Sequence, residues 1–281
     1  MRFGLDNTSI VDINEALRWA KQQLKFSTTP ELDARVILMH LLHLNSTELL
    51  SRTNDLLPIA KLVKFRKMVA NRKRGVPVAY IVGKKEFYGI SLKVNRSVLI
   101  PRPATEAIVE ATLNLIKKLR ANTVYEIGTG SGAIAIAITK TVPTVKVVAS
   151  DVSEKVLRVA RENIVQHGLT HKIKLVKSNL GEHIKKATLV VANLPYLPTG
   201  LKVKRDINFE PKQALYAKDG GLDLYKKLFS RTKTEYAVIE LGATQVAPMT
   251  RWLVEKFPKA EIQSVKDIDG TVCGLVIEFV A

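Results

Sequence analysis

Two short runs in this sequence combine residue types that can bind a ligand with positions at the ends of strand candidates. The first, Glu126–Gly132 (EIGTGSG), follows an apolar stretch and precedes a helix candidate. Its glycines permit a tight turn and let a ligand approach the main chain. The second, Asn193–Tyr196 (NLPY), follows a later apolar stretch. Because an asparagine side chain has an acceptor oxygen and a donating NH2 group, this run can orient a polar group of a substrate.

A carboxylate adds a third candidate binding group. Asp151 ends a second strand candidate about 20 residues beyond the glycine run, where a carboxylate can accept hydrogen bonds from both hydroxyls of a ribose. In an open α/β sheet, ligands bind outside the carboxyl ends of the strands, where the strand order reverses. We therefore expect both runs and Asp151 to line one crevice. Alternatively, Asp151 caps the helix that follows it.

The glycine run favours S-adenosylmethionine over a bare phosphate group as its ligand. A phosphate-binding loop requires Gly-Lys-Ser/Thr after its glycines, whereas residues 131–134 read Ser-Gly-Ala-Ile. From the loop alone, a nicotinamide dinucleotide remains an alternative cofactor. That alternative does not explain the asparagine run.

The asparagine run predicts methyl transfer to an amide nitrogen. Such a nitrogen is a poor nucleophile because its lone pair is delocalised into the carbonyl group. Asn193 Oδ1 and a main-chain carbonyl of the run can hold the NH2 group with one face toward the methyl donor, while Tyr196 stacks on the amide plane. Catalysis is then mainly alignment, and it requires neither a metal nor a general base. The alternative is that the run is only a turn after a strand.

The larger, C-terminal part of the chain predicts an α/β fold. Strands are predicted at 124–127, 145–150, 173–176, 188–192, 236–241 and 272–280, and helices at 132–141, 154–167, 222–230 and 245–256. This alternation predicts a mostly parallel sheet that is covered by helices on both faces.

The first part of the chain predicts a helical bundle. One apolar stripe comprises Ile13, Leu17, Ala20 and Leu24. Thr29 is expected to cap a helix that begins at Pro30, and further helices are expected to open at Ser46 and Pro58. We divide the chain into a helical bundle at 1–76, a β-hairpin linker at 77–100 and a methyltransferase domain at 101–281.

The composition fits a soluble, basic, globular protein of the cytoplasm. No apolar run approaches the ~20 residues of a membrane span, and the N-terminus lacks the features of a secretory signal, so we expect no membrane partner. The net charge of +18 favours an acidic protein or a nucleic acid as partner, or reflects only a basic, soluble surface. A single cysteine, Cys273, excludes an intrachain disulfide and is expected in a core strand. The histidines form no credible metal site.

Several longer runs closely resemble the HemK/PrmC family, the peptide-chain release factor glutamine methyltransferases. The runs are Pro30–Arg35 (PELDAR), Arg72–Gly83 (RKRGVPVAYIVG), Glu86–Gly89 (EFYG), Leu99–Glu106 (LIPRPATE), Phe209–Pro211 (FEP) and the two runs described above. Many methyltransferases share the glycine run, whereas Ile-Pro-Arg-Pro-x-Thr-Glu beside the other runs is much more specific.

The resemblance implies a five-helix N-terminal domain that docks the substrate, a hairpin linker and a seven-stranded, Rossmann-like methyltransferase domain. It implies methylation of the side-chain amide nitrogen (N5) of the glutamine in the Gly-Gly-Gln tip of a release factor. The implied cofactor-binding residues are Gly128, Thr129, Gly130, Ser131, Gly132, Asp151, Asn179, Leu180 and Asn193, and those implied at the glutamine are Asn193, Leu194, Pro195 and Tyr196. The chain departs from the family pattern in having Leu194 in place of proline, and Asn179 and Ala104 in place of aspartate.

Three rival functions remain open. A methyltransferase for the exocyclic amine of adenine or cytosine in nucleic acid would also suit the asparagine run and the basic charge. No separate target-recognition domain is evident, so we expect no stable binding of nucleic acid. A second rival modifies a glutamine of a ribosomal protein, and a third only binds the cofactor without catalysis.

Overall fold

The computed structural model describes residues 11–203 and 205–280. These residues form two compact units, one of residues 11–83 with the short segment 205–209, the other of residues 84–203 and 210–280. Residues 1–10 and 281, which fall within the predicted bundle and methyltransferase domain, lie outside the described residues.

The first unit is a small helical bundle. Its elements are β1 (Val11–Asp12), α1 (Ile13–Gln23), α2 (Pro30–Leu42), α3 (Ser46–Ser51), β2 (Leu56–Leu57), α4 (Ile59–Lys73) and α5 (Val78–Val82). The predicted stripe of α1 packs into the core of this unit, together with Leu62, Phe65 and Val69 of α4. As predicted, α2 begins at Pro30 and α3 at Ser46.

The cap predicted for α2 is wrong in one respect. Thr29 is the N-cap residue, but its side chain makes no capping bond. Its hydroxyl donates instead to the buried Asp33 at 3.0 Å, a carboxylate that also accepts from Ser27 Oγ at 2.6 Å and Arg72 Nε at 2.6 Å. A buried carboxylate needs such donors, so it takes the threonine hydroxyl away from the helix end. The Asp33–Arg72 pair also joins the Pro30–Arg35 run to the Arg72–Gly83 run.

The second unit is built on a seven-stranded sheet. Its strands are β5 (Thr123–Ile127), β6 (Lys146–Asp151), β7 (Ile173–Lys177), β8 (Ala187–Ala192), β11 (Thr234–Glu240), β12 (Glu261–Lys266) and β13 (Val272–Glu278). Their order is β12-β13-β11-β8-β5-β6-β7. The strands from β11 to β7 are parallel, whereas β13 runs antiparallel to both β11 and β12. Cys273 is buried on β13, the core strand position predicted for it.

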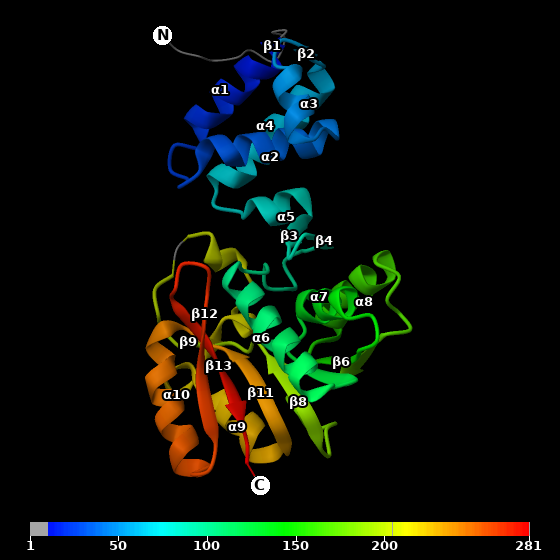
Figure 1. Ribbon diagram of the computed structural model, residues 1–281. Helices are drawn as coiled ribbons and strands as arrows, with labels where there is room; N and C mark the ends of the chain where they lie inside the picture. Colours follow the sequence, from blue (N-terminus) through cyan, green and yellow to red (C-terminus); the bar gives the residue numbers. More distant parts are fainter. Residues whose placement is uncertain (1–10, 204, 281) are drawn as a thin grey trace. The chain divides into compact units, whose positions relative to one another are not determined.

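Helices cover both faces of this sheet (Figure 1). Residues of α6 (Ala104–Leu119), α7 (Ala133–Thr141) and α8 (Glu154–Gln166) pack against one face, and residues of α9 (Asp223–Arg231) and α10 (Ala243–Lys256) against the other. Along β8, Leu189 and Val191 face the first layer, while Val190 faces the second. This alternation of buried residues is the pattern of a central strand in a three-layer α/β fold, and it confirms the predicted fold class.

The segment at 77–100 contains more than the predicted hairpin. Strands β3 (Lys84–Phe87) and β4 (Ile90–Lys93) pair in antiparallel fashion, but α5 precedes them. Short strands β9 (Leu197–Pro198) and β10 (Tyr216–Ala217) pair beyond the asparagine run.

Candidate active site

The strand order reverses between β5 and β8. These strands are neighbours, although the chain passes from β5 through β6 and β7 before it reaches β8. The glycine run leaves the carboxyl end of β5, Asp151 ends β6, and the asparagine run leaves β8. Ligands of open α/β sheets bind at such a reversal, outside the carboxyl ends of the strands.

A cavity of about 500 Å³ lies at this position. Its walls include ten of the residues predicted for the site, namely Gly128, Thr129, Gly130, Ser131, Asp151, Asn179, Leu180, Asn193, Leu194 and Pro195. Two predicted residues, Gly132 and Tyr196, do not line it. Gly132 is the N-cap residue of α7 with a φ of +83°, and a Cβ there would lie 3.4 Å from Ile136 Cδ1 and 3.6 Å from Ala160 Cβ. Its role in the structure is to shape the turn into the helix.

The glycine turn lies directly against the asparagine run. Gly128 has a φ of +77°, a conformation that side chains rarely adopt. A Cβ at this position would lie 3.0 Å from Leu194 Cδ2 and 3.6 Å from the main-chain oxygen of Asn193. The absence of a side chain at Gly128 therefore lets the two loops approach closely at one end of the sheet.

Asp151 and Asn179 place oxygen acceptors on the cavity wall. Asp151 accepts from the main-chain N–H of Gly130 at 3.4 Å and of Ser153 at 3.0 Å, and burial raises its pKa above the ordinary value. Ser153, not Asp151, is the N-cap residue of α8. Asn179 Nδ2 donates to Glu182 at 3.2 Å, so its Oδ1 is the atom left to accept from a ligand.

The Asn193 side chain is held by its nitrogen. Nδ2 donates to Glu240 Oε2 at 2.8 Å and to Thr105 Oγ1 at 3.2 Å. An ionised carboxylate only accepts hydrogen bonds, so the NH2 group must face Glu240. Among the described residues, none donates to Asn193 Oδ1. This oxygen is therefore available to accept from a ligand in the cavity that Asn193 lines.

Tyr196 is not among the residues that line the cavity. Its hydroxyl donates to Glu240 Oε1 at 3.2 Å, and its ring packs against the apolar core around α9 and α10. Burial, followed by the nearby Glu240, raises the pKa of this phenol well above its ordinary value. Tyr196 thus supports the carboxylate that holds Asn193, and the structure does not place its ring on the cavity wall.

Glu240 was not predicted from the sequence as a residue of the site. It ends β11, which pairs with β8 in the sheet, and its side chain is almost completely buried. Burial raises its pKa to about 7, although hydrogen bonds from Thr105, Tyr196 and Asn193 favour the charged form. One signal was present: Glu240 is a carboxylate at the carboxyl end of an apolar strand.

The run Leu99–Glu106 holds three parts of the second unit with three polar side chains. Arg102 pairs with the buried Glu210, whose other oxygen accepts from the N–H of Ile100 at 3.0 Å. Thr105 donates to Glu240 at 2.6 Å, and Glu106 accepts from the N–H of Tyr88 at 2.8 Å. The run therefore connects the hairpin, Glu210 and the end of β11.

Glu126 is a second buried carboxyl beside the glycine turn. It lines the cavity, and Thr129 Oγ1 donates to it at 2.7 Å. Burial raises its pKa to about 8.

Within the described residues, no group of three or more His, Cys, Asp or Glu side chains could hold a metal ion. Nor does any described helix combine the length and apolar character needed to cross a bilayer.

Comparisons with known proteins agree with this architecture. A model of the PrmC N-terminal domain matches residues 15–83, and a model of the methyltransferase small domain matches residues 104–216. The N-terminal domain of human METTL16 in complex with SAH has a similar fold, with a TM-score of 0.51 at 18% identity over 79% of this chain and 83% of that one.

Full sequences give a more specific result. A bifunctional methyltransferase of Rickettsia typhi is 32% identical over 77% of this chain and 47% of its own length, so the chain spans about half of that relative. The release factor glutamine methyltransferase of Bacillus subtilis is 33% identical over 94% of this chain and 98% of its own length. The chain therefore belongs to the release factor glutamine methyltransferase family.

Proposed function

We propose that this protein transfers the methyl group of S-adenosylmethionine to the side-chain amide nitrogen of the glutamine in the Gly-Gly-Gln sequence of a peptide-chain release factor. One observation carries the proposal. Asn193 offers only its carbonyl oxygen to a cavity that the adjoining glycine turn also lines. That arrangement suits a flat NH2 group beside a nucleoside cofactor.

The residues of the cavity fit S-adenosylmethionine chemically. Asp151 can accept from the two ribose hydroxyls, and Asn179 Oδ1 from the amino group of adenine. Val152, Val156 and Leu180 supply apolar wall beside them. Gly130 leaves its main chain accessible, since a Cβ there would have nothing within 4 Å. When bound, the cofactor supplies a methyl group on a sulfonium, which needs no further activation.

The protein's own contribution is to orient the acceptor. Asn193 Oδ1 and a main-chain carbonyl of the asparagine run accept the two N–H bonds of the glutamine amide. With both bonds fixed, the amide plane cannot turn, and one face of the nitrogen points toward the methyl donor. Such alignment is worth several kcal/mol of a reaction barrier. After transfer the nitrogen releases its proton, so no side chain needs to act as a general base beforehand.

The domain and partner assignments belong to the same proposal. The helical bundle at 1–76 docks the release factor, and the α/β domain at 101–281 binds the cofactor and the glutamine. The membership of the chain in the family supports a release factor as partner. The excess of basic residues suits an acidic protein surface.

A panel of substrates tests the proposal. The protein is incubated with labelled S-adenosylmethionine and, in parallel, with a release factor, its Gly-Gly-Ala variant, ribosomal protein and DNA. Label is expected on the intact release factor alone. Label on DNA or on ribosomal protein would favour the rival functions, and equal label on the Gly-Gly-Ala variant would contradict a glutamine acceptor.

A further inference from the structure

Glu240 is a buried carboxylate that accepts hydrogen bonds from three side chains on two segments, the start of α6 and the asparagine run. Oε2 accepts from Thr105 at 2.6 Å and from Asn193 at 2.8 Å, and Oε1 accepts from Tyr196 at 3.2 Å. The side chain is only 2% exposed. Burying a carboxylate is costly unless hydrogen bonds compensate, and packing alone would be served better by an apolar residue.

We infer that Glu240 is a positioning residue that fixes which end of the Asn193 amide faces the substrate. An asparagine amide can turn by half a rotation and exchange its oxygen for its NH2 group at nearly the same place. Glu240 prevents this exchange because a carboxylate offers acceptors only. The site consequently presents an acceptor and selects substrates with N–H bonds to donate.

The surroundings of Glu240 support this role. Thr105 Oγ1 donates to Glu240 and accepts from Asn193, so the three side chains form a closed triangle. Tyr225 links the main chain at the ends of β8 and β11. Its hydroxyl accepts from the N–H of Leu194 at 2.9 Å and donates to the carbonyl of Glu240 at 2.6 Å. Both ends of the Asn193–Glu240 contact are therefore fixed by their own strands.

Reversing the polarity of the pair gives a sharp test. In Asn193→Asp, two carboxylates face each other and the site is expected to lose activity. In Asn193→Asp with Glu240→Gln, the glutamine can donate its NH2 group to Asp, whose second oxygen remains an acceptor for the substrate. We expect kcat of the double variant to exceed that of Asn193→Asp by at least about tenfold, a difference of about 1.4 kcal/mol in the barrier.

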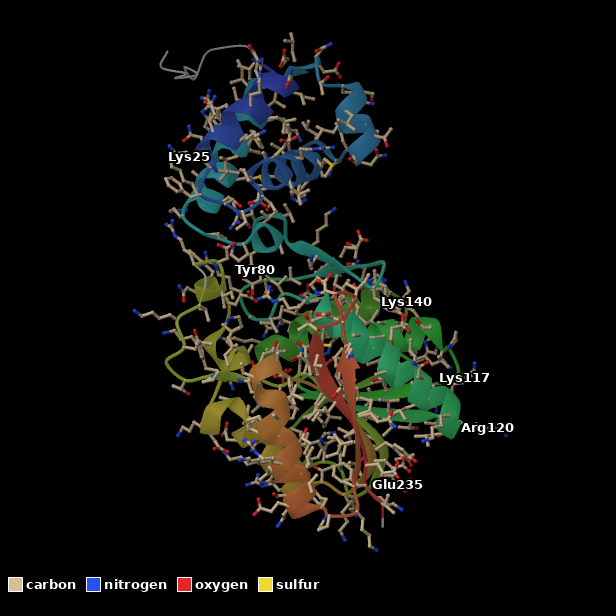
Figure 2. The ribbon with its side chains drawn as sticks, turned by 60° about the vertical axis from the view of Figure 1, so that its left-hand side comes forward. Lys25, Tyr80, Lys117, Arg120, Lys140 and Glu235 are labelled. Atoms are coloured by element: carbon tan, nitrogen blue, oxygen red, sulfur yellow. The ribbon has the colours of Figure 1, made fainter. Side chains whose placement is uncertain are left out.

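Two further variants separate positioning from packing. Glu240→Met has a similar length but no acceptor, and kcat should fall at least tenfold while KM and cofactor affinity change little. Glu240→Gln offers a donor as well as an acceptor, so it lets the Asn193 amide turn and should lower kcat by less than Glu240→Met does. Glu235→Gln on the same strand, at a half-buried position labelled in Figure 2, removes an ion pair with Lys186 and serves as the control.

Each kcat is divided by the fraction of protein that binds cofactor in calorimetry, so unfolded variants do not affect the comparison. A double variant no more active than Asn193→Asp would overturn the inference. So would a Glu240→Met variant as active as wild type.

Because the acceptor in these assays rests on the proposed function, a second readout uses no substrate. In assigned NMR spectra of the wild-type protein, the Asn193 side-chain NH2 protons should be shifted downfield by the carboxylate, and Glu240→Met should remove that shift. Unshifted protons in the wild type would contradict the positioning role. Absence of label on the release factor, with the shift present, would contradict the proposed function alone.

Discussion

Asn193 and Asp151 serve different parts of the proposed reaction. Asn193 is held by Glu240 and Thr105 through its nitrogen, which leaves its oxygen for the substrate. Asp151 lies at the end of β6, on the part of the cavity wall that suits a ribose. Cofactor binding and methyl transfer should therefore respond to different substitutions.

Asn193→Ala is expected to abolish methyl transfer and to leave cofactor affinity within about threefold of wild type. Asp151→Ala should weaken cofactor binding by about 1.5–3 kcal/mol, the range for hydrogen bonds to a charged group. Calorimetry with S-adenosylmethionine and single-turnover assays at saturating cofactor measure the two effects. Equal loss of cofactor affinity in both variants would contradict this division of roles.

The pH dependence of kcat should follow Glu240. Burial raises the pKa of Glu240 to about 7. Below this pH the carboxyl carries a proton, so it can donate to Asn193 and turn the amide. The ionisable groups around it are Arg102, Tyr196, Tyr225 and Cys273, of which the last three have raised pKa values and stay neutral near pH 7.

We expect kcat to fall about tenfold per pH unit below this pKa and to level off above it. Because glutamine does not titrate, the decline should be absent in Glu240→Gln. A pH–rate profile at saturating cofactor and substrate checks both variants. An identical acid decline in wild type and Glu240→Gln would assign the titration to another group.

Glu126 should affect stability rather than alignment. Its pKa is raised by burial from 4.5 to about 8. The native state therefore keeps a proton that the unfolded state loses. This contribution to the free energy of unfolding is complete below about pH 4.5 and is lost as the pH rises through about 8.

Glu126→Gln keeps an uncharged side chain at every pH. Relative to wild type, its free energy of unfolding should rise by about 1–3 kcal/mol between about pH 5 and pH 8. Urea unfolding at both pH values measures the difference. A difference that does not change with pH would show that Glu126 is ionised in the native protein.

At the scale of secondary structure, the start of α6 holds the site together. Arg102 precedes this helix and pairs with Glu210, which is buried. Removing one partner of a buried pair leaves the other charge without compensation.

Arg102→Ala should therefore lower the free energy of unfolding by about 2 kcal/mol, less than for a fully buried pair because Arg102 is partly exposed. Adding Glu210→Gln to Arg102→Ala should restore part of the lost free energy of unfolding. Lys118→Ala, at the other end of α6, removes an exposed ion pair with Glu278 and should cost less than about 0.5 kcal/mol. Thermal unfolding of the three variants checks this order, and equal losses for Arg102→Ala and Lys118→Ala would contradict it.

Most elements of the sheet could be predicted because their residues are strongly apolar. Strand β12 was missed, since its sequence EIQSVK is mostly exposed at the edge of the sheet and lacks a clear alternation. Helix α6 was missed although Ile108, Val109, Leu115 and Ile116 are buried at helical spacing. Its start after Pro103 has no side-chain cap to signal it.

The site could be predicted only in part, because some of its residues come together only through strand pairing. The loops that leave β5, β6 and β8 could be predicted because glycine, aspartate and asparagine residues directly follow apolar strand candidates there. Glu240 depends on the pairing of β8 with β11, which only the folded sheet reveals. Tyr196, whose ring was expected to stack on the substrate amide, donates its hydroxyl to Glu240, so its position depends in turn on that residue.

At the scale of the whole molecule, the dominant feature is the net charge of +18. Exposed basic residues include Lys117, Arg120 and Lys140, which project from the α/β unit in Figure 2. A positive surface accelerates encounter with an acidic partner, and salt screens that attraction.

The KM for a release factor should accordingly rise severalfold between about 50 and 300 mM NaCl, while kcat stays constant. Cofactor affinity is the control, and it should change little because the cavity is small and partly enclosed. Steady-state assays over this range of salt check the prediction. A KM that is independent of salt would show that the basic surface takes no part in docking.

The arrangement of Asn193 can be tested most directly by a crystal structure of the protein with S-adenosylhomocysteine and a Gly-Gly-Gln peptide. We predict that Asn193 Oδ1 lies about 2.9 Å from the glutamine amide nitrogen, with Asn193 Nδ2 still bound to Glu240. A peptide glutamine bound away from the glycine turn, or an Asn193 whose NH2 group faces the peptide, would contradict it.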